Sequence, residues 1–411
     1  MDTTDALFHA DNSPDLAVTR AEVLARVDTI LPILGRLAEQ AEADRDLSPE
    51  SIDALIESGA LRLFVPRRFG GYEAGYRTYV ETAIKLATVC GSSAWLCFIT
   101  NHGDWHAGQM SQSVQDTVWA NGPAAKVSTP LTPAPGWSAQ DVDGGINVSG
   151  EWPYTSGSSF AKWSLIAFPK LDVDGLPVDN ILGLVSNDRA KIRDTWRVSG
   201  MAATGSNTLV VEDAFIPHEH TMLMSDMLAN RFPTPYKTES LYHMDVGAVF
   251  HLATLAPCVG LAKAAFDLTL ARITTKPKAM TYTFYGDTTK APATQFAMAK
   301  AGWLIDTTLE QTRSTADAID RQARTGRSFS GLERGTFAMR SGMGHRMCRE
   351  AMDLLLDVHG AGAFALTNPV QRIWRDFHIA SRHGMSVPGL KQEIYGRALL
   401  SAEEQHMTPL V

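Results

Sequence analysis

The periodicity of apolar residues changes twice along the chain, and this order limits the folds that the sequence can adopt. From Leu16, apolar residues recur at spacings of three and four, as on one face of a helix. Between Pro123 and about Pro235 the chain has many Pro and Gly residues and short β-branched or alternating runs, which indicates a compact β-sandwich or barrel. Helical spacing returns after about Tyr242. The order α, β, α predicts two helical layers around a β module.

Individual residues place some helix boundaries. Ser48 can cap the free N–H groups of a helix whose first position is Pro49, and Gly59 predicts its end. An apolar, helix-like stretch runs from Tyr79 to about Phe98. Near the C-terminus, a periodic segment is expected to stop at Gly360.

Composition narrows the class of protein. The chain has 411 residues, with 37 Lys and Arg against 45 Asp and Glu, so its formal net charge is −8. An acidic surface repels phosphate, which argues against a nucleic-acid partner. The longest apolar stretch, Leu252 to Ala262, is broken by Pro257 and is shorter than the roughly 20 residues that cross a bilayer. The four cysteines form no CxxC pair, and Met1 to Ala6 lack the pattern of a signal peptide. We therefore expect a cytoplasmic protein with no membrane span, disulfide scaffold or zinc ribbon.

Two segments of the predicted β region combine aromatic and hydroxyl side chains. The segment from Trp152 to Gly157 contains Tyr154 and Ser156, which could hold a flat heteroaromatic ligand. The alternative, which local chemistry alone favours, is a strand end with a Ser-Gly turn. The loop from Gly200 to Asn207 is made of small residues and hydroxyls, so it either lets a ligand approach the backbone or only connects two strands.

Two histidine pairs have spacings that could suit metal ligands. His102 and His106 lie four residues apart, so on a helix they share a face, as metal ligands do. No glutamate stands between them in the zincin arrangement, and no third ligand is evident nearby. His218 and His220 likewise lack a third partner. We therefore predict no metal site.

The segment from Arg340 to Arg397 is basic within an acidic chain. It holds seven Arg and one Lys against five acids, a local balance of +3, which is compatible with binding an anionic phosphate. His383 lies in an apolar and basic run, where an imidazole either titrates in a pocket or is a surface residue. No GxGxxG follows a strand and no Walker loop occurs, so nucleotide binding of the Rossmann or P-loop kind is excluded.

Several short motifs follow one another in an order that is specific as a set. They are Leu61-Arg-Leu-Phe-Val-Pro-Arg-Arg-Phe-Gly-Gly, Ser92-Ser-Ala-Trp95, Trp152-x-Tyr-x-Ser156-Gly, Asp194-Thr-Trp, Thr204-Gly-Ser, Phe215-Ile-Pro, Asp357-Val-His-Gly360-Ala-Gly and Pro369-Val-Gln-Arg-Ile-Trp-Arg-Asp-Phe-His378. In this order the chain resembles the acyl-CoA dehydrogenase superfamily over nearly its whole length. Within it, the chain resembles the group D oxygenase components of two-component flavin-dependent monooxygenases.

The resemblance implies an α+β fold that is mainly α. We expect an N-terminal helical domain (residues 1–122), a middle β-barrel domain (123–235) and a C-terminal four-helix bundle (236–411). Such chains usually assemble as homotetramers, with flavin between barrel and bundle and part of its pocket from a neighbouring subunit. The implied order agrees with the α, β, α pattern read from the residues.

One departure separates the branches of the superfamily. True acyl-CoA dehydrogenases carry a Glu-Gly-Thr motif after the Arg-Asp helix, whereas the stretch from Ile379 to Pro388 contains no carboxylate. A dehydrogenase needs a base to remove the α-proton, so this absence favours oxygen chemistry. The resemblance then implies O₂ as co-substrate and reduced flavin (FADH2 or FMNH2) from a separate NAD(P)H-dependent flavin reductase. The chemistry would pass through a C4a-hydroperoxyflavin that must be shielded from water.

The resemblance also implies roles for individual residues. His383, with His378 as the alternative, is expected near flavin N5, where it protonates or holds the peroxide. Ser156 is expected to contact the flavin near N5 or its carbonyl edge, and His102 matches a histidine that accepts the proton of a phenol. Ser128 is expected to contact substrate or flavin. Further contacts with the cofactor are expected from Trp95, Trp152, Tyr154, Thr204, Ser206, Arg272 (to the flavin phosphate) and Gly360.

The predicted function is hydroxylation of an electron-rich aromatic, such as a phenol, an indole or a fused polycycle. Two enzymatic alternatives on the same framework are N-oxygenation of an amine such as an amino sugar, and an acyl-CoA dehydrogenase-like oxidase. A third interpretation is a helical assembly or binding protein that has kept the fold and lost the reaction. The presence of Ser156 and His383 counts against it.

Overall fold

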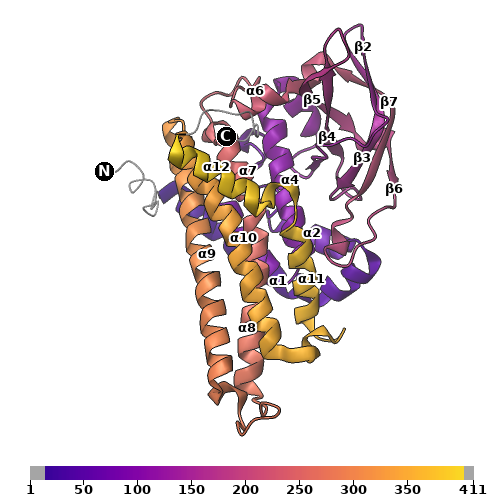
Figure 1. The fold of residues 1–411 in the computed structure, drawn as a ribbon. Helices are drawn as coiled ribbons and strands as arrows, with labels where there is room; N and C mark the ends of the chain where they lie inside the picture. Colours follow the sequence, from indigo (N-terminus) through magenta and orange to yellow (C-terminus); the bar gives the residue numbers. More distant parts are fainter. Residues whose placement is uncertain (1–13, 402–411) are drawn as a thin grey trace.

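The computed structural model describes residues 14–401, and its elements follow the order that the sequence predicts (Figure 1). The expectation about a leader concerns Met1 to Ala6, which lie outside the described residues. The first part of the chain forms the helices α1 (Pro14–Asp44), α2 (Pro49–Glu57), α3 (Tyr76–Ala87), α4 (Gly91–Gln109) and α5 (Gln112–Val118).

The strands form two sheets that share an apolar core. One has the order β1-β4-β5-β8 and the other β2-β3-β7-β6, and every pairing is antiparallel except that of β1 with β4. Trp152, Phe168 and Val211 are buried together between the sheets, so the module is the kind of two-sheet packing that the patterning predicts. The bounds are β1 (Val127–Ser128), β2 (Ser138–Val142), β3 (Gly145–Thr155), β4 (Trp163–Leu171), β5 (Pro177–Ser186), β6 (Ala190–Arg193), β7 (Asn207–Pro217) and β8 (Thr221–Leu223). The division into three domains at residues 122 and 235 stays a prediction.

Long helices complete the chain, and α8, α9, α10 and α11 pack alongside one another as a bundle (Figure 1). The bounds are α6 (Met224–Leu228), α7 (Val246–Leu252), α8 (Leu255–Thr275), α9 (Pro292–Thr325), α10 (Gly331–His359), α11 (Pro369–Ala380) and α12 (Pro388–Leu400). Among the described residues, the segment Val246–Thr275 is long and apolar enough to cross a membrane, but 83% of its most apolar window is buried inside the protein. It therefore fits a core helix.

The helix boundaries test the local predictions. The hydroxyl of Ser48 accepts a hydrogen bond from the backbone N–H of Ser51, the third residue of α2, and Gly59 adopts a left-handed φ of 83° just beyond the helix end. Gly360 ends α10, also with a positive φ. The stretch from Tyr79 to Phe98, in contrast, is two helices, because the chain leaves α3 after residue 87 and begins α4 at Gly91.

Helix α4 lies between the bundle and the sheets, and nearly all of its residues are buried (Figure 1). It crosses the start of β1 at Gly103, where a Cβ atom would lie 2.0 Å from the carbonyl oxygen of Val127. Next to this crossing, the Nζ of Lys126 lies 3.0 Å from Oδ2 of Asp104, and both side chains are almost fully buried. The ion pair therefore fixes the position of α4 against the sheet.

Replacing Asp104 by leucine is expected to lower the free energy of unfolding by about 3–5 kcal/mol, because it leaves the Lys126 ammonium buried without its counter-ion. The shift of the urea midpoint, followed by far-UV circular dichroism, measures this loss. The double variant Asp104→Leu/Lys126→Met removes both charges and is expected to recover most of it. A double variant as unstable as Asp104→Leu would show that the loss comes from packing and not from the unpaired charge.

Candidate active site

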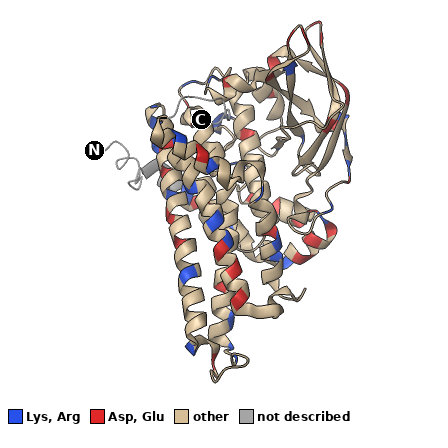
Figure 2. Cartoon of the chain, viewed as in Figure 1, with Lys and Arg blue, Asp and Glu red and all other residues tan. Residues whose placement is uncertain are grey.

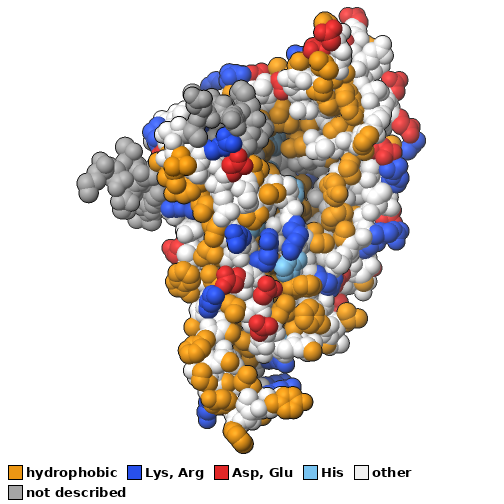
Figure 3. Space-filling model, viewed as in Figure 1, with side chains coloured by type: hydrophobic (Ala, Val, Ile, Leu, Met, Phe, Trp, Pro, Cys, Tyr) orange, Lys and Arg blue, Asp and Glu red, His pale blue; other side chains and the backbone are white. Residues whose placement is uncertain are grey.

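A cavity of about 570 Å³ lies where α4, the end of β3, the loop before β7 and the end of α11 meet. Figure 3 shows a hollow between helices and sheets on this face of the molecule. Its walls are mostly apolar and include the rings of Trp95, Phe98, Trp196 and Phe250. A volume in the range of about 300–1,000 Å³ with aromatic walls is typical of small-molecule sites.

One edge of the cavity carries three hydroxyl groups that are hydrogen-bonded in series. Thr204 donates to the carbonyl oxygen of Met201 (2.8 Å), Ser206 lies 2.7 Å from Thr204, and Ser156 lies 2.7 Å from Ser206. The indole N–H of Trp95 donates to the Ser156 hydroxyl (3.3 Å). Each hydroxyl has one hydrogen, so when all these bonds form, Ser206 donates to Thr204 and Ser156 donates to Ser206. A ligand in the cavity then finds one remaining lone pair on Ser156.

His383 presents a hydrogen-bond donor to the same cavity. Its Nδ1 accepts the backbone N–H of Met385 (3.3 Å), so in the neutral ring the hydrogen is on Nε2. Burial lowers the pKa of His383 below its usual value, which favours this neutral form. The ring centroids of His383 and Trp95 are 5.6 Å apart, so the imidazole is held against the aromatic wall.

Two further histidines of α4 line the cavity, and their nitrogens differ in availability. His102 donates from Nδ1 to the carbonyl oxygen of Phe98 (2.8 Å), and its Nε2 lies 3.1 Å from the Tyr76 hydroxyl. His106 has its Nδ1 3.0 Å from Oε1 of Gln109, and Nε2 has no hydrogen-bond partner among residues 14–401. The single hydrogen of the Tyr76 hydroxyl is shared between the Nε2 of His102 and the carbonyl oxygen of Val249 (3.2 Å), whereas the Nε2 of His106 has no hydroxyl beside it and keeps a free lone pair.

The electrostatics of the cavity keep these rings neutral. Burial lowers the pKa of His102 to about 3 and that of His106 to about 4. The described residues that line the cavity include no Asp or Glu, and Arg382 is its one charged side chain. Near neutral pH the site therefore offers neutral imidazoles and hydroxyls.

The structure brings seven of the predicted site residues to this one cavity. They are Trp95, His102, Tyr154, Ser156, Thr204, Ser206 and His383.

Five other predicted residues do not line the cavity. Trp152 is buried between the sheets, where its indole N–H donates to a carbonyl oxygen of β4 (2.8 Å), and the hydroxyl of Ser128 bonds a serine of β4 (2.7 Å). His378 packs against aromatic rings of α11. Arg272, near the end of α8, contacts the last residue of α10, which places it beside Gly360 at the far end of the bundle.

Several residues of the cavity have no role predicted from the sequence. The spacing of His106 from His102 suggests only a metal pair. Trp196 lies in the motif Asp194-Thr-Trp, which predicts no role for the indole. Phe250 of α7 carries no local signal, and its ring lies beside that of His106, with 5.7 Å between the ring centroids. Arg382 lies in the basic C-terminal segment, two residues beyond the end of α11.

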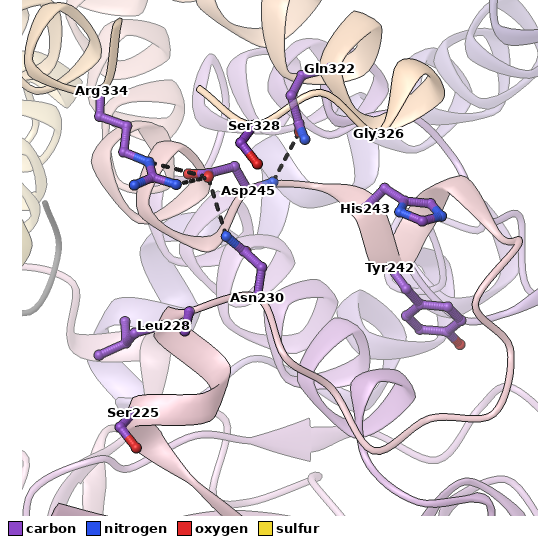
Figure 4. A pocket seen from close by; sticks show the side chains of 11 residues that line it. Ser225, Leu228, Asn230, Tyr242, His243, Asp245, Gln322, Gly326, Ser328 and Arg334 are labelled. Carbon is purple, nitrogen blue, oxygen red and sulfur yellow. Dashed lines mark hydrogen bonds and ion pairs between the residues drawn. The ribbon is translucent and has the colours of Figure 1, made fainter. Parts of the chain in front are cut away.

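A second cavity of about 650 Å³ lies near the start of α7 (Figure 4). Its polar groups mainly bond one another. Asp245 caps α7 and accepts from Arg334 (2.7 Å) and Asn230 (3.3 Å), and its backbone N–H donates to Gln322 (3.1 Å). This network connects α7, α9 and α10, so its polarity has a structural explanation.

A helical bundle, a two-sheet module and a cavity between them define the acyl-CoA dehydrogenase fold class. The model of the family "Acyl-CoA dehydrogenase, C-terminal domain" matches residues 252–388. The solved structure of XiaF from Streptomyces sp., in complex with FADH2 and glycerol, has a TM-score of 0.89 at 26% identity. The match covers 96% of this chain and 98% of that one.

Curated relatives show which family within this fold class the chain resembles in sequence. The oxygenase subunit HsaA of a flavin-dependent monooxygenase from Rhodococcus jostii (strain RHA1) is 32% identical over 382 residues, which cover 91% of this chain and 97% of the relative. The oxygenase component of p-hydroxyphenylacetate 3-hydroxylase from Acinetobacter baumannii is 25% identical over 399 residues, covering 95% and 91%. This chain belongs to the family of oxygenase subunits of flavin-dependent monooxygenases.

Proposed function

We propose that this protein is the oxygenase component of a two-component monooxygenase that hydroxylates an electron-rich aromatic compound. The observation that carries the proposal is the convergence of two groups on one aromatic-walled cavity, the Nε2–H of His383 and the hydroxyl of Ser156. One is a neutral donor and the other keeps an acceptor lone pair. A site of this kind can hold a flat heterocycle by its polar edge.

The cavity fits a flavin ring by size and by chemistry. Its volume of about 570 Å³ accepts a tricyclic ring together with a small aromatic substrate. Trp95 and Trp196 provide flat walls, and the lone pair of Ser156 suits an N–H group, which the reduced ring carries. A bound reduced flavin supplies two electrons, with which O₂ gives one oxygen atom to the substrate and the other to water.

Residues of the chain exclude water, donate a hydrogen bond to the reacting oxygen and accept a proton from the substrate. The apolar walls exclude water, which limits the reduction of O₂ to H₂O₂ without transfer of oxygen to the substrate. We assign to His383 a hydrogen bond from Nε2–H to the reacting oxygen. We assign to His106 the acceptance of a substrate proton at Nε2, because that nitrogen is free whereas both nitrogens of His102 have protein partners.

The lining also distinguishes the alternatives. An acyl-CoA dehydrogenase-like oxidase needs a base to remove an α-proton, commonly a carboxylate, and the described lining has no Asp or Glu. An amino sugar would need several polar partners, whereas the walls here are mostly apolar. Both points support an aromatic substrate.

The proposed function includes partners and a location. A separate NAD(P)H-dependent flavin reductase would supply FADH2 or FMNH2, because the reduced cofactor must come from outside the oxygenase component. We also propose a homotetramer and a cytoplasmic location.

The test is to mix the protein with anaerobically reduced FAD or FMN, and then with isotopically labelled O₂ and a phenol or an indole. We expect labelled hydroxylated product by mass spectrometry, with one labelled atom per product, and little H₂O₂. The control is the same mixture without protein. Oxidation of all the reduced flavin with an equal amount of H₂O₂ formed from O₂, at the rate of the control and with every aromatic compound, would contradict the proposal.

A further inference from the structure

The backbone of Met201 connects the wall of the cavity to the bundle. Met201 lines the cavity, and it has a left-handed φ of 52° although it is not a glycine. Its carbonyl oxygen accepts hydrogen bonds from the hydroxyl of Thr204 (2.8 Å) and from the indole N–H of Trp196 (3.0 Å). One backbone oxygen therefore fixes an aromatic wall of the cavity and the first hydroxyl of the series that ends at Ser156.

A buried carboxylate holds this backbone in place. Oδ1 of Asp376, on α11, accepts the backbone N–H of Met201 at 2.5 Å, and both residues are almost fully buried. Burial raises the pKa of Asp376 to about 6, so the group is ionised at pH 7, and a bond to an ionised acceptor is stronger than one between neutral groups. Left-handed backbone is strained at a residue with a side chain and persists only where its surroundings fix it. The carboxylate of Asp376 is such a contact.

Other contacts dock the surrounding loop on α11. Gly200 packs against this helix so closely that a Cβ atom would lie 2.4 Å from the carbonyl carbon of Arg375. Arg375 forms an ion pair with Glu42 of α1, and Figure 2 shows basic positions on α11 beside acidic positions of the first helices. These contacts hold the loop as a whole, whereas Asp376 binds the one residue, Met201, whose carbonyl oxygen receives the hydroxyl series.

The carbonyl oxygen of Met201 determines the direction of the hydroxyl series. A carbonyl oxygen only accepts, so Thr204 donates to it, and the two serines then donate towards it in turn. Ser156 also receives the N–H of Trp95, so it presents a lone pair and no hydrogen to the cavity. Without that acceptor, Thr204 is free to donate to Ser206. The series then reverses, and Ser156 presents its hydrogen instead.

We propose that Asp376 is a positioning residue for the flavin ring, which acts through the backbone of Met201 on the direction of the hydroxyl series. This inference rests on the proposed function. The reduced ring carries an N–H group where the oxidised ring has only an acceptor nitrogen, so an acceptor at Ser156 suits the reduced ring and a donor would suit the oxidised one. Asp376 does not line the cavity, so its effect on the ring is indirect.

The test measures the dissociation constants of the reduced and oxidised forms of FAD or FMN, whichever flavin binds more tightly, anaerobically and by the change in tryptophan fluorescence. The ratio of the two constants gives the preference for the reduced ring. Replacing Asp376 by alanine should lower this preference by about tenfold, because the hydrogen bond from the reduced ring to Ser156 is lost. Asp376→Asn keeps an oxygen that accepts the Met201 N–H, so it should retain the preference.

Two further variants trace the route of the effect. A glycine adopts left-handed backbone without strain, so Asp376→Ala/Met201→Gly should recover most of the preference, with Met201→Gly alone as the reference for the lost side chain. Thr204→Val removes the first hydroxyl of the series but leaves the bond from Met201 to Asp376 intact, and it should lower the preference as Asp376→Ala does. Thr204→Val replaces Asp376→Ala in the test if the latter does not fold, as judged by far-UV circular dichroism.

Asp116→Ala is the matched control, because it removes an exposed carboxylate of α5 and should leave both dissociation constants unchanged. Equal weakening of both flavin forms by Asp376→Ala would show a structural role only and would overturn the proposal, as would an unchanged preference in Thr204→Val. A double variant with the preference of Asp376→Ala would exclude the route through Met201. Binding of neither form to the unmodified protein would instead contradict the proposed function.

Discussion

Replacing His383 by alanine is expected to lower the hydroxylated product formed per reduced flavin by about 100-fold, with the balance of the O₂ released as H₂O₂. The physical reason is the loss of the Nε2–H donor, which the Met385 N–H fixes in its tautomer by bonding Nδ1. Removing one preorganised donor from an active site costs a factor of about 100 to 1,000 in rate. The measurement is the ratio of product to H₂O₂ in single turnovers started from reduced flavin.

The His383 prediction has a pH signature. Because burial lowers the pKa of His383, the ring stays neutral above the usual histidine value of 6.5, and the product ratio should be independent of pH there. His383→Gln retains an N–H donor and should recover part of the ratio. His218→Ala, at an exposed histidine after β7, is the matched control. A normal product ratio in His383→Ala would exclude Nε2 as the donor to the reacting oxygen.

The sequence predicts the layers of the fold because they depend on local periodicity and capping. Ser48 and Gly360 mark helix ends through their own backbone preferences. The break between α3 and α4 escapes such reasoning. Apolar residues stand on both sides of Thr88 and Gly91, and the tight packing at the start of α4 is a tertiary contact. A Cβ atom on Gly91, the first residue of α4, would lie 2.8 Å from Oδ2 of Asp376 and 3.1 Å from Leu261.

The candidate site shows the same limit at the level of single side chains. Trp152 and Tyr154 lie two apart on a strand, so simple alternation puts them on one face. The register of β3 against β7 shifts between Trp152 and Thr155, and Tyr154 has a positive φ of 62°. This irregularity leaves Trp152 in the sandwich core and turns Tyr154 out to the cavity. Sequence therefore finds the motif but not which aromatic ring reaches a ligand.

Replacing His106 by leucine is expected to lower the rate of phenol hydroxylation near pH 7 by about 100-fold or more, the usual contribution of a positioned base. The burial that lowers the pKa of His106 to about 4 keeps its Nε2 lone pair available at pH 7. The rate of the unmodified protein should therefore fall only as the pH drops through about 4, where the ring becomes protonated, and should be level above it.

In the His106→Leu variant the substrate must lose its proton to water, so the rate should rise about tenfold per pH unit towards the phenol pKa of about 10. A matched variant separates the two histidines of α4. His102→Leu leaves the Nε2 of His106 free and removes the hydrogen bonds of His102 with Tyr76 and Phe98, so it should lower stability without making the rate depend on phenol ionisation. If His102→Leu instead gave the pH-dependent recovery and His106→Leu did not, the base would be His102. Tyr76 would then have to leave its nitrogen when substrate binds.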